Sequence, residues 1–290
     1  MGFAFHSPDT IDDAIALARQ YGDAARFIAG GTDLIIQMNR KRLAPDHLIS
    51  LARLGLDRIT ETPTDYVIGA MATHDAIVTH PAFQRELIAL PQAASVVGGR
   101  QVRNMGTIGG NIVNASPAAD VVPVLLVLEA TVELEGSAGN RAMLLDRFLV
   151  ERGRTERKQD EILTAVRFAK PSATSATAFL KAGRRKAMEI SVICVAVHLV
   201  LDAAGEGCAK ARIAIGAAAS RTFRASEAEA FVEGKTASGD IFREAGRLAA
   251  ERATPISDVR SSARYRKLLV AALVERALTN CHDHIVQGGR

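Results

Sequence analysis

Two glycine pairs are the features of this sequence most suited to chemistry. The first lies in AGGTDL at 29–34, at the end of the apolar stretch RFIA, and the second lies in TIGGN at 107–111. Glycine lacks a Cβ, so its backbone turns through positive φ easily and a ligand can approach the main-chain N–H groups closely. N–H groups gathered at a strand-to-helix switch bind phosphate. Two such turns suggest a ligand with a diphosphate held from both sides, as in a dinucleotide.

The glycines also have a less specific interpretation. Neither turn has the G-x-G-x-x-G spacing of a Rossmann site, and two ordinary tight turns explain the glycines alone equally well. The sequence shows no histidine–carboxylate or paired-carboxylate arrangement for acid–base catalysis, and CHDH at 281–284 is more typical of a solvated tail than of a metal site. We therefore expect no catalytic residue and no metal in this chain.

Composition narrows the class of protein further. The 290 residues include 36 basic and 32 acidic ones, for a net charge of +4, with 4% aromatic residues and no Trp. Nucleic-acid binders usually concentrate basic residues beside aromatic ones, and the one dense basic run here is GRRK at 183–186. We interpret that run as a solvated loop, and we expect no nucleic-acid partner.

Cysteine usage and apolar stretches indicate the compartment. Cys194, Cys208 and Cys281 are far apart and form no C-x-x-C pair, which disfavours a zinc or iron–sulfur ligand set in this chain. An odd cysteine count without a signal peptide is typical of the cytoplasm. The most apolar stretches are about ten residues long, whereas a membrane span needs roughly 20. We expect a cytoplasmic protein without an integral membrane segment.

The elements that must position the two turns follow from periodicity and capping. Ser7-Pro8-Asp9 predicts a helix start, and Gly22 predicts the end of that helix. We expect strands at 26–29, 47–51, 66–71 and 131–136. We expect helices at 32–41, capped by Thr32, at 81–98 with a break near Pro91, and at 118–130.

A different pattern of predicted strands and helices begins near residue 160. The stretches 161–168, 177–183, 189–202 and 209–219 read as strands of an antiparallel meander, and 226–234, 239–253 and 261–278 read as helices. In the last helix the apolar residues at helical spacing are Tyr265, Leu268, Leu269, Ala272 and Leu273. The pattern favours an α+β fold with a domain boundary near Lys170-Pro171-Ser172.

Six segments together resemble a known family. AGGTDLIIQM, ATHDAI, QVRNMGTIGGNIVNASPAAD, EILTAVRF, AFLKAGRRKAMEISV and SARYRKLL, in this order, resemble the FAD-binding medium subunit of the molybdenum hydroxylases, which include xanthine dehydrogenase and carbon monoxide dehydrogenase. The resemblance implies a two-lobed FAD-binding domain of the vanillyl-alcohol-oxidase-like type at 1–170, split near 55. It also implies a C-terminal flavoprotein domain at 171–290, with an antiparallel sheet and a small helical bundle.

The resemblance also implies the residues that contact FAD. One diphosphate loop would consist of Ala29, Gly30, Gly31, Thr32, Asp33 and Leu34. The other would consist of Thr107, Ile108, Gly109, Gly110 and Asn111, with Asn114 and Ser116 close by. Asp120 matches an aspartate that hydrogen-bonds the polyol of the flavin nucleotide, and Val97, Leu163 and Lys181 match positions at the adenine or flavin end. Near ATHDAI, we prefer Thr73 over His74 as the residue that touches the cofactor.

The function implied by the resemblance is electron transfer within a larger assembly. A large molybdopterin subunit would oxidise the substrate, and a small subunit would carry electrons through two 2Fe–2S clusters to FAD in this chain. NAD, oxygen or a quinone would be the final acceptor, and the assembly would be a dimer of heterotrimers. Two rivals remain: a stand-alone flavin-dependent oxidase of the same fold, and a non-redox nucleotide-binding or scaffold protein.

Overall fold

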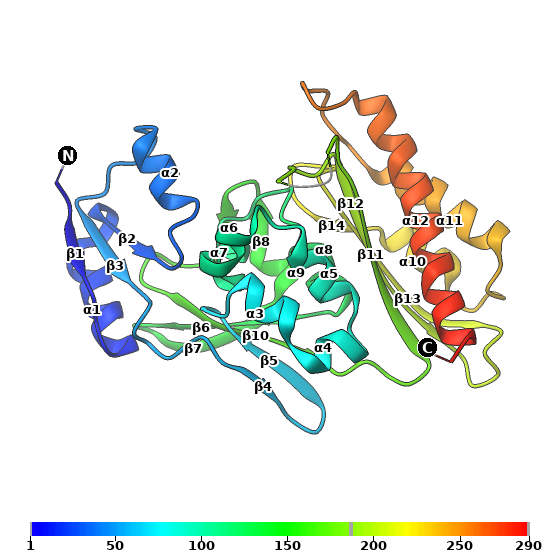
Figure 1. Ribbon diagram of the computed structural model, residues 1–290, viewed down its shortest axis with the longest axis horizontal. Coiled ribbons are helices and arrows are strands. Elements are labelled where there is room, and N and C mark those ends of the chain that lie inside the picture. Colours follow the sequence, from blue (N-terminus) through cyan, green and yellow to red (C-terminus); the bar gives the residue numbers. More distant parts are fainter. Residues whose placement is uncertain (1, 186–187, 289–290) are drawn as a thin grey trace.

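The computed structural model describes residues 2–185 and 188–288, which form three units side by side (Figure 1). Met1, the last two residues, and Lys186 and Ala187 of the segment AFLKAGRRKAMEISV lie outside the described residues. The N-terminal unit has a parallel sheet in the order β1-β3-β2. Its elements are β1 (Ala4–His6), α1 (Ile11–Tyr21), η1 (Gly22–Ala24), β2 (Ala25–Ile28), α2 (Leu34–Asn39) and β3 (His47–Ser50).

Helix α1 begins later than predicted. The Ser7-Pro8-Asp9 start is wrong, because Thr10 is the N-cap and its side chain accepts a hydrogen bond from the amide of Asp13. Both stretches carry a hydroxyl followed by acidic residues, so sequence spacing alone does not separate them. The predicted end at Gly22 is confirmed. Thr32 is likewise not a cap, because α2 begins at Leu34 and its N-cap position is Asp33.

The central unit is built on a five-stranded antiparallel sheet in the order β4-β5-β10-β6-β7. Its strands are β4 (Ile59–Glu61), β5 (Asp65–Gly69), β6 (Thr131–Gly136), β7 (Gly139–Leu144) and β10 (Ile162–Ala169), with a small two-stranded sheet of β8 (Leu149–Glu151) and β9 (Arg154–Thr155). Its helices are α3 (His74–Thr79), α4 (Pro81–Glu86), α5 (Ala89–Ser95), α6 (Arg100–Met105), α7 (Ile108–Val113), α8 (Val121–Val127) and α9 (Leu145–Phe148).

Two predictions in this unit are wrong. The strand at 161–168 exists as β10, but it pairs with β5 and β6 and is not part of the C-terminal meander. The helical stretch at 81–98 breaks at Leu87 and Ile88, and Pro91 lies inside α5. Proline is tolerated there because the N–H groups of the first turn of a helix have no partner within the helix.

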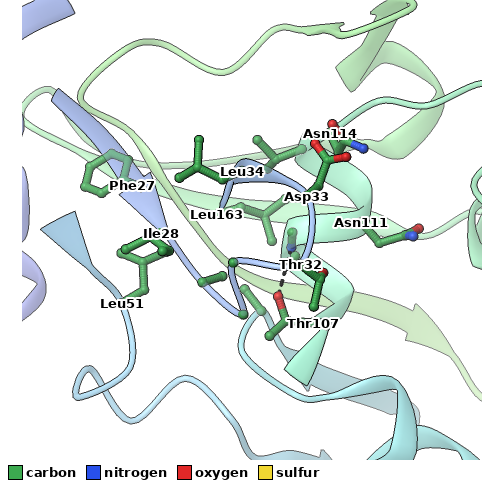
Figure 2. A pocket seen from close by; sticks show the side chains of 18 of the residues that line it. Phe27, Ile28, Thr32, Asp33, Leu34, Leu51, Thr107, Asn111, Asn114 and Leu163 are labelled. Atoms are coloured by element: carbon green, nitrogen blue, oxygen red, sulfur yellow. Dashed lines mark hydrogen bonds between the residues drawn. The ribbon is translucent and has the colours of Figure 1, made fainter. Parts of the chain in front are cut away.

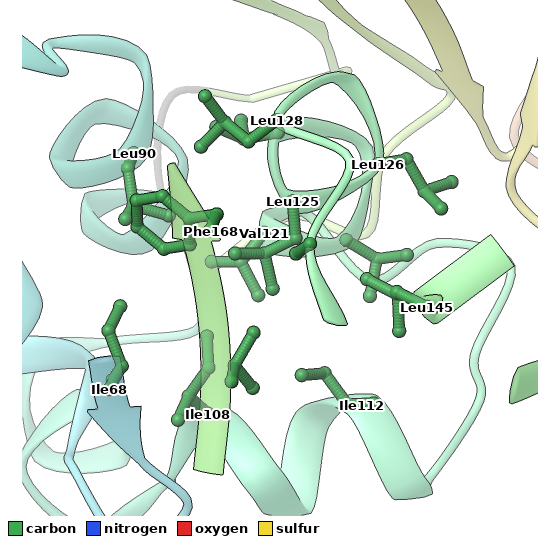
Figure 3. Packing of buried hydrophobic residues seen from close by; sticks show 14 of the residues in the cluster. Ile68, Leu90, Ile108, Ile112, Val121, Leu125, Leu126, Leu128, Leu145 and Phe168 are labelled. Atoms are coloured by element: carbon green, nitrogen blue, oxygen red, sulfur yellow. The ribbon is translucent and has the colours of Figure 1, made fainter. Parts of the chain in front are cut away.

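Helix α8 is the centre of the main core (Figure 3). All seven of its residues are buried, because the run VVPVLLV is apolar on every side. Ile68 of β5, Ile108 and Ile112 of α7, and Phe168 of β10 belong to the same core. Helix α7, which carries the second glycine pair, contacts β10 and β5 of the sheet directly and also packs against α8.

The C-terminal unit is an antiparallel sheet in the order β11-β12-β13-β14, with three helices on its outer face (Figure 1). Its elements are β11 (Ser175–Ala182), β12 (Ile193–Leu201), β13 (Cys208–Gly216), β14 (Phe223–Arg224), α10 (Ser226–Val232), α11 (Gly239–Arg252) and α12 (Ala263–Val286). This confirms the α+β class and the C-terminal antiparallel sheet with helices. The predicted apolar face of α12 is partly wrong, because Tyr265 and Leu268 are more than half exposed while Val270, Val274 and Leu278 are buried.

Ion pairs that all run in the same direction join the central and C-terminal units. Among the described residues, each ion pair across this joint has its carboxylate in the central unit and its cation in the C-terminal unit. The pairs are Asp120–Lys181, Asp146–Arg221, and Glu129 with Lys210, Arg212 and Arg224. The three cations around Glu129 outweigh the burial of its carboxyl group and lower its pKa to about 2.

Candidate functional site

A cavity of about 410 Å³ lies between the N-terminal and central units, within the roughly 300–1,000 Å³ typical of small-molecule sites. Figure 2 shows Phe27, Ile28 and Leu51 at one end, and Thr32, Thr107 and Asn111 towards the other. The cavity is therefore apolar at the end of Phe27, Ile28 and Leu51 and polar towards its other end. Thirteen of the predicted site residues line it: Ala29, Gly30, Gly31, Thr32, Asp33, Leu34, Val97, Thr107, Gly109, Gly110, Asn111, Asn114 and Leu163.

The first glycine pair forms an open loop of unpaired amides. The backbone N–H groups of Gly30 through Leu34 donate no hydrogen bond to any other residue that the structure describes. Gly31 has φ +69°, a conformation that favours glycine. Gly30 packs directly on the carbonyl group of Met105 at the end of α6, where a Cβ would overlap the oxygen. This loop therefore presents consecutive free donors to the cavity, as an anion site requires.

The second glycine pair is different from the predicted turn. It follows α6 rather than a strand, and Gly109 and Gly110 lie in the first turn of α7. The amides there are already used: those of Ile108 and Gly109 donate to carbonyls of Ala72 and Ala70 at 3.0 and 2.9 Å. The amide of Gly110 donates to Oγ1 of Thr107 at 3.1 Å. This segment offers a ligand a close approach rather than a row of amides.

Five predicted residues lie outside the cavity wall: Thr73, Ile108, Ser116, Asp120 and Lys181. Thr73 caps α3 by accepting from the amide of Ala76, and Ile108 is wholly buried in the core. His74 lines the cavity, whereas Thr73, the residue predicted to touch the cofactor, does not. Burial and the nearby charge of Arg103 lower the pKa of His74 to about 4, so its imidazole is neutral at pH 7.

Asp120 and Lys181 form a buried ion pair beside the cavity. The Lys181 ammonium donates to Asp120 Oδ2 at 2.8 Å, and the Ser191 hydroxyl donates to Oδ1 at 2.5 Å. Lys181 also donates to the backbone carbonyls of Val96 and Glu189. Burial raises the pKa of Asp120, and the ammonium opposes that effect. Asp120 occupies the N-cap position of α8 without a side-chain capping bond, so it does not simply cap that helix.

Comparison with known families identifies the family of the chain. Residues 1–171 match the model of the FAD binding domain in molybdopterin dehydrogenase, and residues 178–281 match that of the CO dehydrogenase flavoprotein C-terminal domain. The chain belongs to this family of FAD-binding dehydrogenase subunits. It is therefore an FAD-binding oxidoreductase component, and the resemblance seen in the sequence is confirmed.

Individual relatives agree with this assignment. The chain is 41% identical over 208 residues to the nicotinate dehydrogenase FAD-subunit of Eubacterium barkeri, covering 70% of each chain. It is 32% identical to the carbon monoxide dehydrogenase medium chain of Afipia carboxidovorans, covering 95% of each. Among solved structures, carbon monoxide dehydrogenase from Hydrogenophaga pseudoflava matches with a TM-score of 0.92 at 31% identity, covering 96% of both chains.

The residues of the cavity fit FAD. The free amides of Gly30 to Leu34 suit a diphosphate, and the apolar end suits a ring. Asn111 lines the cavity, and its Oδ1 is buried without a hydrogen-bond partner among the described residues. A buried acceptor left unpaired costs free energy. A hydroxyl of a bound nucleotide would satisfy that atom.

Sequence reasoning missed the wall at the apolar end. Phe27 and Leu51 line the cavity, and the guanidinium of Arg157 lies 5.7 Å from the centre of the Phe27 ring. Arg157 comes from the loop after β9, and in the sequence it stands in a run of charged residues, ERGRTERKQDE, that reads as solvated. Only the long-range fold brings this side chain to the cavity.

The two glycines of α7 should respond differently to alanine. A Cβ at Gly109 would lie 2.7 Å from both Cβ and the carbonyl oxygen of Ala70, so Gly109→Ala should destabilise the fold by roughly 1–3 kcal/mol. A Cβ at Gly110 meets only Oγ1 of Thr107 closely, at 3.0 Å, and Gly110 faces the cavity. Gly110→Ala should therefore keep the stability and weaken FAD binding about tenfold.

Thermal unfolding of flavin-free protein and titration with FAD measure the two effects separately. Each variant is the control for the other, because both add one methyl group to neighbouring positions of one helix. Normal FAD affinity in Gly110→Ala would show that this glycine does not adjoin the cofactor.

Proposed function

We propose that this chain is the FAD-carrying electron-transfer subunit of a molybdenum-containing hydroxylase or dehydrogenase. Electrons arrive from 2Fe–2S clusters of a partner subunit and leave to a final acceptor such as NAD, oxygen or a quinone. The observation that carries the proposal is the run of free amides from Gly30 to Leu34 in the wall of a cavity whose volume lies in the range of small-molecule sites. When bound, FAD supplies a carrier that accepts electrons singly and can deliver a pair.

The contribution of the chain is placement of the cofactor. Free amides of the first loop hold the diphosphate, and Asn111 with Asn114 contacts the polyol or ribose. Neutral His74 provides a wall without a positive charge. Thr73, Ser116, Asp120 and Lys181 complete the proposed set next to the cavity, and Ile108 supports it from the core.

The proposed partners are a small subunit with two 2Fe–2S clusters and a large molybdopterin subunit, arranged as a dimer of heterotrimers in the cytoplasm. No helix in the described part of the chain is both long and apolar enough to cross a membrane. We keep the division into an FAD-binding domain at 1–170, with two lobes split near 55, and a C-terminal domain at 171–290.

An exposed apolar patch supports a docking surface near the cofactor. Met188, Ile190 and Val259 are each at least 60% exposed. Arg184 donates to the carbonyl of Val259 at 3.0 Å, which holds the two loops together, and Met188 lies beside Gly99, two residues from Val97 in the cavity wall. Apolar side chains exposed in this way are typical of protein interfaces.

We expect the FAD to be bound without a covalent link. The cavity wall consists of amides, hydroxyls, carboxamides, apolar groups and the charged side chains of Arg26, Asp33, Arg157 and Glu161. It contains no cysteine or tyrosine, and its one histidine is the neutral, buried His74. Acid precipitation should release the flavin into the supernatant, which absorbance at 450 nm would quantify. Yellow colour that stays with the pellet would contradict this expectation.

The function is tested by comparing the lone chain with the assembly. The chain is expressed alone and with its two partner subunits, and reduction of an artificial dye by a purine, an aldehyde or an N-heterocycle is measured. We expect the lone chain to bind FAD and to show no turnover. Turnover by the lone chain at the rate of the assembly would establish a stand-alone oxidase, and a colourless chain would establish a scaffold protein.

A further inference from the structure

A second cavity, of about 300 Å³, adjoins the apolar end of the FAD cavity. Its wall consists of Ala18, Asp23, Ala25, Arg26, Phe27, Ile49, Arg157 and Gln159. Arg26, Phe27 and Arg157 line both cavities, so these side chains form the partition between them. No part of the proposed electron-transfer function uses this second cavity.

The two arginines are held in place by neutral groups. Nη1 of Arg157 donates to the carbonyls of Lys158, Gln159 and Glu161 at 2.9, 3.2 and 2.7 Å. Nη1 of Arg26 donates to the carbonyls of Asp23 and Ala25 at 2.9 and 2.7 Å. These bonds fix the guanidinium planes and supply no negative charge.

The carboxylates around the cavity are exposed or engaged elsewhere. Glu161 forms a two-bonded ion pair with Arg141, and Asp160 accepts from the hydroxyl and the amide of Ser137. Asp23 lines the cavity but is exposed to solvent. Among the described residues, neither Arg26 nor Arg157 has a carboxylate within ion-pair distance. Two like charges therefore face one small cavity, and the one carboxylate in its wall, that of Asp23, is solvent-exposed and forms no ion pair with either of them.

Such an arrangement is unfavourable for the protein alone. Burial lowers the pKa of the Arg157 guanidinium, the charges of Glu161 and Asp160 oppose that effect, and the charge of Arg26 adds to it. A cation that is partly buried without a counter-charge destabilises the fold, whereas a guanidinium pair binds tetrahedral oxyanions through several parallel N–H bonds. An anion bound in the second cavity would supply negative charge between the two guanidinium groups and so remove the repulsion between them.

We propose that Arg26 and Arg157 bind a phosphate-sized oxyanion in the second cavity, at a site separate from the diphosphate of FAD. The second cavity is lined by both arginines and by none of the residues Gly30 to Leu34, whose free amides belong to the wall of the first cavity. The separation of the two sites rests on FAD occupying the first cavity as proposed above.

The test uses flavin-loaded protein whose flavin content has first been measured. The melting temperature is followed while inorganic phosphate replaces chloride at constant ionic strength. We expect saturating phosphate to raise the melting temperature by about 2–4 °C. The rise should disappear in Arg157→Gln and in Arg26→Gln. It should persist in Arg152→Gln, which removes the same charge from an exposed position of the neighbouring turn.

Three results would overturn the proposal: no rise in the wild-type protein, the same rise in all variants, or a rise confined to flavin-free protein. The last would mean that phosphate occupies the FAD cavity instead. Absence of the phosphate effect in wild-type protein with normal flavin content refutes only the anion site, whereas wild-type protein without flavin refutes the proposed function. If one arginine variant does not fold, the other arginine variant compared with Arg152→Gln still separates binding at this site from the general stabilising effect of phosphate.

Discussion

Replacing Gly30 with alanine should leave the protein nearly free of FAD. A Cβ at this position would overlap the carbonyl group of Met105, which belongs to the backbone and cannot rotate away. The loop of free amides from Gly30 to Leu34 would have to move off α6, and with it the diphosphate site. Overpacking of this kind costs roughly 1–3 kcal/mol, which corresponds to about a 5- to 150-fold loss of FAD affinity if the whole cost falls on the bound state.

Gly99→Ala is the matched control for this experiment. Gly99 also lies near the cavity, but its φ is −99° and a Cβ there would meet only flexible side chains at 3.4 Å or more. Flavin content after purification and the dissociation constant of FAD should therefore stay normal in Gly99→Ala. A Gly30→Ala protein that is fully yellow would show that the contact with Met105 does not set the position of the loop.

Replacing Asp120 with alanine should have the largest effect on stability. The change removes the carboxylate that holds Lys181, whose side chain is only 11% exposed, and leaves an ammonium and the Ser191 hydroxyl without their acceptor. Breaking a buried ion pair by removing one partner typically costs about 3–5 kcal/mol. Urea unfolding of the flavin-free protein should therefore shift strongly towards lower urea.

The double variant Asp120→Ala/Lys181→Met tests the cause. Because it removes both charges, it should recover much of the lost stability. If Asp120 also contacts the FAD polyol, as the family resemblance implies, the double variant should regain stability without regaining FAD affinity. A single variant as stable as the wild type would mean that the ion pair is not a structural part of the joint.

The fold was predictable where local pattern and burial agree. The apolar run of α8, the end of α1 at Gly22 and most strands follow from periodicity. The strands that pair with β10 could not be predicted from periodicity, because a strand pattern shows which face is buried and not which strand lies beside it. The face of α12 was misassigned because a long helix of mixed polarity offers more than one apolar stripe, and the sheet beneath it decides which is buried.

The candidate site was predictable as a set of segments, and less so in its chemistry. Thirteen predicted residues meet in one cavity because they come from segments that together resemble one family, whereas the glycine turns alone did not distinguish a binding site from ordinary turns. Sequence cannot show whether an amide is free, and the amides of Ile108, Gly109 and Gly110 are taken by partners. Arg157 was missed for a similar reason, since its place beside Phe27 depends on residues 130 positions apart in the sequence.

At the joint between the central and C-terminal units, the central unit supplies the carboxylates and the C-terminal unit supplies the cations. This arrangement limits how the N-terminal part of one family member can be combined with the C-terminal part of another. A chimaera of residues 1–170 with the C-terminal part of a relative keeps the carboxylates of Asp120, Glu129 and Asp146 and imports all their partners. It remains well folded only if the relative supplies cations opposite these three places. We therefore expect substitutions at Lys181, Arg212 and Arg221 to occur together with substitutions of the acidic residues that face them. This requirement restricts which members of the family can recombine at this joint.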